Sequence, residues 1–161
     1  MASYPNTLLK AHGTAVGLPS DEDMGNSEVG HNAIGAGQVF AQGAKLVSAA
    51  IATGDMFRAQ GWTEIRDNAV KNASTLHFIG LFSDGNVHSH VDHLKAMIGK
   101  AKEDGVKTVR IHILLDGRDV GETSALEYVE PFEAFLSTVN DGVFDARIAS
   151  EIGRASCRER V

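Results

Sequence analysis

Ser27 is the side chain whose surroundings in this sequence are best suited to chemistry. It lies in the segment MGNSEVGHNAIGAG, residues 24–37, where glycines and small polar residues leave room around its hydroxyl. A serine alcohol is a weak nucleophile at neutral pH and needs a base or a metal ion to hold it as an alkoxide. Gly25 would allow a close backbone approach, and Asn26 and Glu28 offer oxygen atoms nearby. The alternative is a structural role in which Ser27 caps a helix.

Two further polar segments each follow an apolar run that is typical of a buried strand. SDGNVH follows TLHFIGLF, and DGRD follows VRIHILL. The carboxyl ends of parallel strands meet at one edge of a sheet, so we expect Asp84, His88, Arg118 and Asp119 to lie there together. The planar guanidinium of Arg118 can bind a carboxylate or phosphate through two hydrogen bonds. The alternative for DGRD is a turn with a surface ion pair.

The hexapeptide HSHVDH, which begins at His88, raises the possibility of a zinc-dependent hydrolase. Clustered imidazoles and a carboxylate are typical zinc ligands, and HxHxDH resembles the signature of the metallo-β-lactamase superfamily. A binuclear site needs further ligands, and His112 is the only histidine that follows. In the structural alternative, Ser89 caps a helix, Asp92 lies at its positive end, and His90 and His93 face solvent.

Hydrophobic periodicity predicts the α/β class, with a parallel sheet built from βαβ units. Before residue 42 the chain is rich in glycine and turns, with only short helical possibilities at 7–10 and 28–33. Later segments alternate between helix and strand, and Pro131 is expected to kink or divide the last helix. The expected helices are 44–52, 62–71, one beginning at 91 and ending before 105, and one carrying Leu126, Val129, Phe132 and Leu136; the expected strands lie within 75–85 and 106–119 and over 146–150.

The composition is that of a soluble globular protein. Of 161 residues, 43% are hydrophobic and 22% are charged, and the formal net charge is −6. An acidic chain without clustered Lys and Arg argues against nucleic acid as a partner. No apolar run reaches the length of a membrane span, and the first twenty residues lack the pattern of a signal peptide. We therefore expect a cytoplasmic, monomeric protein that acts on a small molecule.

Three blocks in order resemble one family, the 2,3-bisphosphoglycerate-independent phosphoglycerate mutases of the alkaline phosphatase superfamily. The first block runs without a gap over residues 4–47 and includes MGNSEVGH. The others are LHFIGLFSDGNVHSH at 76–90 and VRIHILLDGRDV at 109–120. One departure is Asn86, which stands where the family has a second glycine; asparagine tolerates the left-handed conformation that such a turn needs.

The resemblance implies an enzyme that interconverts 3-phosphoglycerate and 2-phosphoglycerate through a phosphoserine intermediate. Ser27 would be the nucleophile and a ligand to one of two Mn²⁺ ions, and 2,3-bisphosphoglycerate would not be required. His88, Arg118 and Asp119 would bind the substrate. The family's other metal ligands have no counterpart in this sequence, so we expect a truncated, inactive piece; the alternative is a fragment with no catalytic role.

The resemblance also implies a division of the chain. Residues 1–42 would be part of the phosphatase-type domain, and residues 43–150 part of the transferase-type, substrate-binding domain. Residues 151–161, EIGRASCRERV, resemble the translation of a DNA sequencing adapter and include the single cysteine, Cys157. We expect this tail to be disordered or to make no specific contacts; the alternative is a disordered basic tail of the protein itself.

Overall fold

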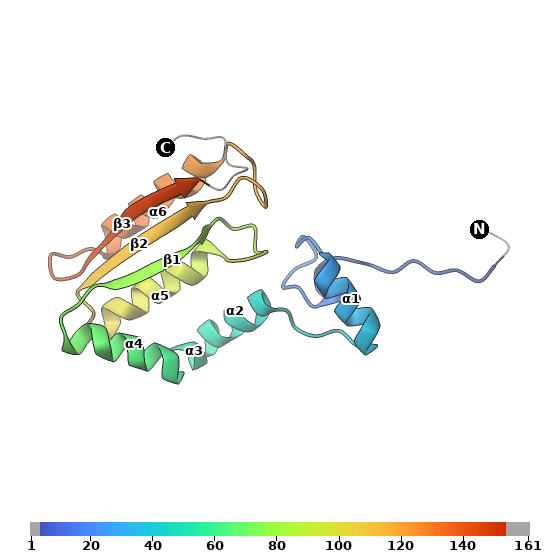
Figure 1. The fold of residues 1–161 in the computed structure, drawn as a ribbon, viewed down its shortest axis with the longest axis horizontal. Coiled ribbons are helices and arrows are strands. Elements are labelled where there is room, and N and C mark those ends of the chain that lie inside the picture. The colour runs from blue at the N-terminus through green and yellow to red at the C-terminus, as the bar shows by residue number, and fades with distance from the viewer. Residues whose placement is uncertain (1–3, 154–161) are drawn as a thin grey trace. The chain divides into compact units, whose positions relative to one another are not determined.

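The structure, a computed structural model, describes residues 4–153 and has the α/β architecture predicted from the sequence (Figure 1). Its elements in chain order are η1 (Gly13–Val16), α1 (Ser27–Ala36), α2 (Gly43–Thr53), α3 (Asp55–Arg58), α4 (Gln60–Lys71), β1 (Leu76–Phe82), α5 (Val91–Glu103), β2 (Thr108–Leu115), α6 (Ala125–Val139) and β3 (Asp145–Gly153). The short helices η1 and α3 were not predicted. The helix expected at residues 7–10 is wrong, because that stretch has no regular structure.

The three strands form one parallel sheet in the order β1-β2-β3, which confirms the predicted topology. Phe82, the last residue of β1, pairs with Leu115, the last residue of β2. The two strands therefore end at the same edge of the sheet. Because α5 connects β1 to β2 and α6 connects β2 to β3, each pair of neighbouring strands forms a βαβ unit.

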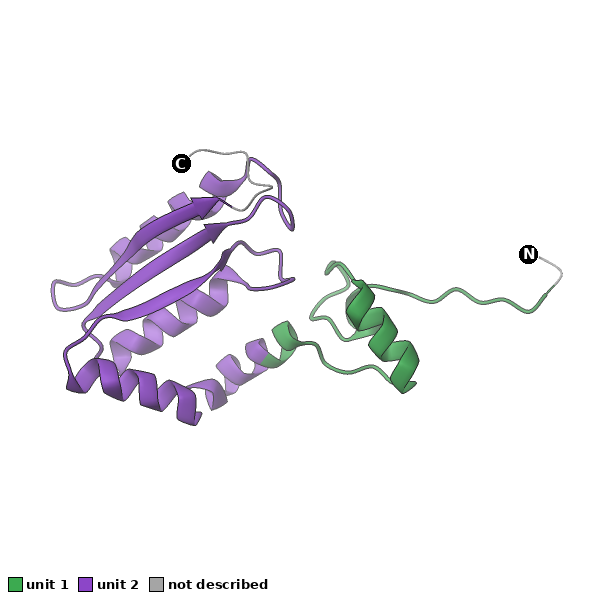
Figure 2. Cartoon of the chain, viewed as in Figure 1, with its two compact units in different colours: residues 1–46 green, residues 47–161 purple. Residues whose placement is uncertain are grey.

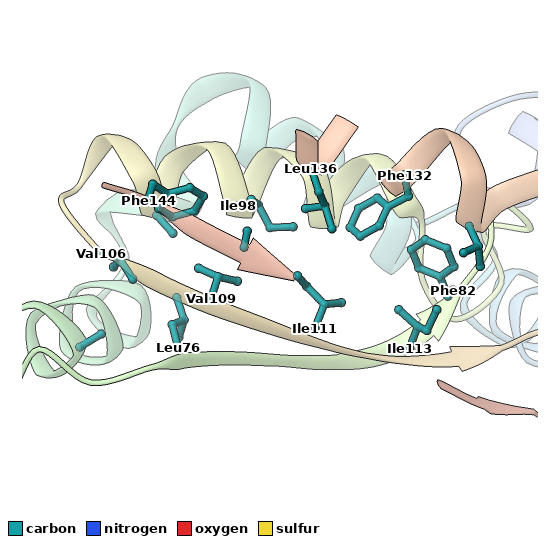
Figure 3. Packing of buried hydrophobic residues seen from close by; sticks show 14 of the residues in the cluster. Leu76, Phe82, Ile98, Val106, Val109, Ile111, Ile113, Phe132, Leu136 and Phe144 are labelled. Carbon is teal, nitrogen blue, oxygen red and sulfur yellow. The ribbon is translucent and has the colours of Figure 1, made fainter. Parts of the chain in front are cut away.

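The core lies between the sheet and helices α5 and α6. Alternate residues of β2, from Val109 to Leu115, are buried, as expected for a strand with one fully covered face. Figure 3 shows Ile98 of α5 and Phe132 and Leu136 of α6 directed toward this face. Phe82 and Phe132 pack edge to face, with ring centroids 4.9 Å apart.

The opposite face of the sheet has a row of polar side chains across all three strands. The Nδ1 atom of His77 lies 2.9 Å from Nε2 of His112, whose Nδ1 lies 2.8 Å from Oγ of Ser150. Ile79, on the same face, is 73% exposed. The prediction that part of the sheet surface is left uncovered is confirmed at this position.

Helix α6 runs without interruption through Pro131, so of the two effects expected of this proline, a kink or a division, the division is wrong. A proline inside a helix removes one backbone hydrogen bond. Burial of Val129, Phe132 and Leu136 on the sheet offsets that loss. Leu126, expected on this buried face, is 39% exposed.

The chain divides into two compact units, residues 1–46 and 47–161 (Figure 2). The predicted boundary after residue 42 coincides with the start of α2, whereas the division between the units falls inside that helix. Among the described residues of the first unit, Val16, Leu18 and Val29 form the cluster of buried hydrophobic residues. This small cluster agrees with the expected poor packing of the first forty-two residues.

Strand β3 continues to Gly153, three residues beyond the predicted end. Glu151, Ile152 and Gly153 pair with Ile113, Leu114 and Leu115. The expectation that the segment beginning at residue 151 makes no specific contacts is wrong for these three residues, since the backbone ladder extends to them. Cys157 and the rest of that segment lie outside the described residues. Across the described residues 4–153, every helix is too short or too polar to cross a bilayer.

Candidate functional site

The two polar turns predicted to meet at one edge of the sheet do so. The first begins at Ser83, directly after β1, and the second at Asp116, directly after β2. They approach closely at Gly85 and Asp119: a Cβ atom built on Gly85 would lie 2.9 Å from the Cβ of Asp119. The two turns are therefore in direct contact, and only glycine fits at Gly85 without displacing its neighbour.

His88 and Asp119 face each other across the two turns. The Nε2 atom of His88 lies 3.9 Å from Oδ2 of Asp119, and the pair carries opposite charges only when the imidazole is protonated. The His88 side chain is 57% exposed and that of Asp119 is 11% exposed. A ligand can therefore reach the imidazole, while most of the Asp119 side chain is covered by neighbouring residues.

Arg118 immediately precedes Asp119, and its side chain is exposed at the same turn. Its backbone N–H donates to Oδ1 of Asp116 over 3.0 Å. The structure thus pairs the imidazole of His88 with the carboxylate of Asp119 and places the exposed Arg118 next to Asp119 in the same turn. Such a set can bind an anion that also carries a hydroxyl group.

The first turn adopts the backbone conformation expected for its sequence. Asn86 has φ of 57°, in the left-handed region, which confirms the prediction that asparagine can serve at this position. The side chain of Asp84 accepts a hydrogen bond of 2.7 Å from the hydroxyl of Tyr128 on α6. Burial, followed by this bond to Asp84, raises the pKa of Tyr128 to about 12.

Sequence reasoning missed Tyr128 because it lies in a helix that the pattern assigns to packing. The sequence did offer one signal: a tyrosine stands beside the apolar positions of that helix, and the hydroxyl of a tyrosine near a core usually has a hydrogen-bond partner. Nothing in the sequence indicated that the partner would be Asp84, which lies 44 residues away.

The histidines of HSHVDH do not form a zinc site. His90, not Ser89, caps α5, because its Nδ1 accepts from the N–H of Asp92 over 3.1 Å. Ser89 donates to the carbonyl oxygen of Leu81 instead. His93 does not simply face solvent: its Nε2 lies 2.9 Å from the hydroxyl of Ser48, and burial lowers its pKa.

A cavity of about 260 Å³ lies between α5 and β1. Its wall is mainly apolar and includes Phe78, Leu94 and Met97, with His88 also lining it. An apolar cavity of this kind does not suit a phosphorylated anion. The exposed turns that carry Arg118 are therefore the better candidate for an anion site.

In the other unit, Ser27 is the first residue of α1 and is exposed. Asn26, not Ser27, caps this helix, because its side-chain oxygen accepts from the N–H of Val29 over 3.0 Å. The structural alternative for Ser27 is therefore wrong, and its hydroxyl is not needed for capping. A Cβ on Gly25 would lie 1.8 Å from the carbonyl oxygen of Ala11, which confirms the close backbone approach predicted there.

His31 is the imidazole nearest to Ser27, but its geometry does not make it a base for that hydroxyl. Its Nδ1 lies 3.2 Å from Oγ of Ser27 and 2.6 Å from the carbonyl oxygen of the same residue. A carbonyl oxygen only accepts, so Nδ1 carries a proton and donates it there. That nitrogen therefore has no lone pair with which to take the serine proton.

The described residues do not fit a metal ion around Ser27. Between residues 4 and 153 there is no group of three or more histidine, cysteine, aspartate or glutamate side chains arranged to hold a metal. Manganese prefers several oxygen ligands, and a single serine hydroxyl does not supply them. A metal at this position would need donors from outside this part of the chain.

Comparison with known proteins identifies a matching family model and similar relatives. Residues 47–160 match the family model described as the BPG-independent PGAM N-terminus. A probable 2,3-bisphosphoglycerate-independent phosphoglycerate mutase of Leptospira interrogans is 59% identical over 151 residues, which are 94% of this chain and 28% of the relative. Phosphoglycerate mutase 1 of that type from Arabidopsis thaliana is 53% identical over 148 residues, 92% of this chain and 26% of the relative.

A solved structure shares the fold. The crystal structure of Leishmania mexicana phosphoglycerate mutase at low cobalt concentration superposes with a TM-score of 0.85 and 50% sequence identity. The matched region covers 89% of this chain and 26% of that protein. This chain thus spans little more than a quarter of the length of the relatives it matches.

Proposed function

Because the chain belongs to the family of BPG-independent phosphoglycerate mutases, we propose that it carries the serine nucleophile and part of the substrate site of an enzyme that interconverts 3-phosphoglycerate and 2-phosphoglycerate. The observation that carries the proposal is the meeting of His88, Arg118 and Asp119 at one sheet edge. These side chains suit a substrate with a phosphate, a carboxylate and a hydroxyl group.

In this proposal the two units have different tasks. The unit that contains Ser27 supplies the nucleophile, as part of a phosphatase-type domain, and the unit that begins at residue 47 binds substrate, as part of a transferase-type domain. Arg118 holds the anionic group through two hydrogen bonds. Asp119 accepts from a glycerate hydroxyl, and His88 donates to the same substrate.

Ser27 would receive the phosphoryl group and return it to the other hydroxyl of glycerate. Its position at the first turn of the ten-residue helix α1 supports this role. The backbone N–H groups and the positive end of the helix dipole stabilise an anionic phosphoserine there. The phosphoserine intermediate is part of the proposal.

We also propose that the longer protein uses two Mn²⁺ ions, with Ser27 as one ligand, and that it is a cytoplasmic monomer. Manganese would supply positive charge at the transferring phosphoryl group. The described residues do not complete such a site, and its other ligands would come from the rest of the longer protein. The names of the relatives state independence from 2,3-bisphosphoglycerate, and we extend this independence to the longer protein.

Two other functions were raised by the sequence. The zinc hydrolase loses its support, because His90 caps a helix and His93 bonds to Ser48. A fragment without catalytic activity keeps its support, since His31 is not placed as a base for Ser27 and a metal site is incomplete in residues 4–153. Binding without turnover is therefore what we expect of the 161-residue chain alone.

A chimera tests the proposed activity. Residues 1–150 would replace the matching segment of the Leptospira interrogans relative, which is 59% identical to this chain. The chimera should convert 3-phosphoglycerate to 2-phosphoglycerate, and His88→Ala in it should lower kcat/KM by about tenfold or more. His93→Ala is the matched control and should leave kcat/KM close to the parent value. Equal losses in both variants, or a folded chimera without activity, would contradict the proposal.

A further inference from the structure

Ser83 and Asp116 form a buried polar pair between the two turns. Their exposed fractions are 1% and 3%, and they are the buried polar residues of the described chain. Each is the first residue after its strand. The hydroxyl of Ser83 donates to Oδ2 of Asp116 over 2.7 Å. This bond links residues that are 33 positions apart in the sequence.

Each member of the pair also holds its own turn. Oγ of Ser83 accepts from the backbone N–H of Gly85 over 3.3 Å. Oδ1 of Asp116 accepts from the N–H groups of Arg118 and Asp119 over 3.0 and 3.1 Å. The two side chains therefore join the backbones of both turns through one continuous set of hydrogen bonds.

A buried carboxylate is costly unless its oxygens are well partnered. Here both oxygens accept hydrogen bonds, and one of those bonds comes from the opposite turn. Apolar packing alone does not require an acid at this position. The hydrogen bonds that Asp116 accepts from the backbone of Arg118 and Asp119 are, by contrast, well suited to fix the positions of these two residues.

We infer that Ser83 and Asp116 are positioning residues, which hold the two turns in the arrangement that lets His88, Arg118 and Asp119 bind one substrate. The inference rests on the proposed function for the identity of the ligand. Neither residue needs to touch the substrate. Their effect is transmitted through the backbone N–H groups of Gly85, Arg118 and Asp119.

Asp141 provides a matched control elsewhere in the same unit. Its Oδ1 accepts from the N–H groups of Val143 and Phe144 over 3.0 and 2.9 Å, the same local pattern as in Asp116. Its side chain is 47% exposed, and the turn precedes β3 rather than following a strand. Asp141→Asn therefore reproduces the local change without affecting the candidate site.

The test uses the 161-residue chain with 3-phosphoglycerate as the probe. Affinity is measured by amide chemical-shift titration of the unsubstituted chain and of Ser83→Ala, Asp116→Asn, the double variant and Asp141→Asn. Loss of a hydrogen bond to a charged group predicts about tenfold weaker binding for each single site variant. The double variant should be little weaker than either single variant, because both substitutions remove the same bond from the Ser83 hydroxyl to a charged carboxylate. Asp141→Asn should bind as the unsubstituted chain does.

Hydrogen exchange of the Arg118 and Asp119 amides gives a readout that needs no ligand. Both amides should exchange faster in Ser83→Ala, which retains Asp116 as an acceptor, while core amides such as that of Ile111 remain protected. Unchanged exchange in Ser83→Ala would overturn the inference, as would faster exchange with unchanged affinity. If the unsubstituted chain does not bind 3-phosphoglycerate, the proposed function fails, and the exchange rates still decide whether the pair positions the turns. Ser83→Ala also serves if Asp116→Asn does not fold.

Discussion

Replacing Gly85 by alanine should separate the two turns of the candidate site. The added Cβ would lie 2.9 Å from the Cβ of Asp119 and 3.3 and 3.4 Å from its carbonyl oxygen and carbon. Nonbonded carbon atoms prefer separations of about 3.5–4.0 Å, so Asp119 must move by roughly 0.6 Å or more. Two of the three close atoms belong to the backbone, so a change of side-chain rotamer cannot relieve the contact.

Overpacking of this kind costs about 1–3 kcal/mol. Taking about 2 kcal/mol for this cost and an m-value of about 2 kcal/mol per molar urea, the middle of the range for a small domain, the unfolding midpoint should fall by roughly 1 M. Gly99→Ala is the matched control: Gly99 lies inside α5, and a Cβ there would meet no atom within 4 Å. Alanine is favoured over glycine in a helix by about 0.5–1 kcal/mol, so this variant should be more stable than the parent.

The single tryptophan is well placed to report this unfolding. Trp62 is 5% exposed, packs against Phe57, and belongs to the same unit as Gly85 and Gly99. Its fluorescence in a urea titration therefore reports the sheet-containing unit and not the unit of Ser27. If both alanine variants were equally stable, the close contact between the turns would be refuted. Weaker binding of 3-phosphoglycerate should accompany the loss of stability only in Gly85→Ala.

Ser27, Arg118 and Tyr128 can each be tested by a single substitution. The 161-residue chain should show no mutase turnover with added Mn²⁺, and in the chimera Ser27→Ala should abolish phosphoryl transfer while preserving the circular dichroism spectrum; turnover by the short chain would contradict this. Arg118→Lys keeps the charge but loses the planar guanidinium that can donate two parallel hydrogen bonds, so 3-phosphoglycerate should bind about tenfold more weakly by titration. Unchanged affinity would show that Arg118 does not bind the substrate. Tyr128 has a raised pKa of about 12, so its contribution to stability is present below about pH 10 and is lost as the pH rises through 12; tyrosinate absorbance should show a step there that Tyr128→Phe lacks.

The sheet and its edge were predictable because they depend on periodicity. The apolar runs before SDGNVH and DGRD are separated by an amphipathic helix. A strand–helix–strand connection of this kind places the two strands parallel and side by side in one sheet. The left-handed backbone conformation of Asn86 was predictable for a local reason, because asparagine is one of the few residues that adopt a positive φ readily. These features follow from a few neighbouring residues and from a rule of chain connectivity.

Other features depended on local backbone direction or on contacts between residues far apart in the sequence. Asn26 and His90 compete with their serine neighbours for the caps of α1 and α5, and the outcome depends on backbone direction at each helix start. The bond between Ser83 and Asp116, and that between Tyr128 and Asp84, join residues far apart in sequence. The end of β3 depends on pairing with β2, which a pattern in β3 alone does not contain.

The distribution of buried residues explains why binding and catalysis can be tested separately in this chain. The turns that carry His88 and Arg118 are anchored on a sheet whose core includes Ile98, Ile111 and Phe132, each no more than 1% exposed. The unit that carries Ser27 has a cluster of three buried hydrophobic residues and therefore a much smaller apolar contribution to its stability. A ligand that recognises the two turns requires only the sheet-containing unit to be folded, and not the unit that carries Ser27. Binding should therefore persist in this chain under conditions in which phosphoryl transfer, which also needs Ser27 in a fixed geometry, does not occur.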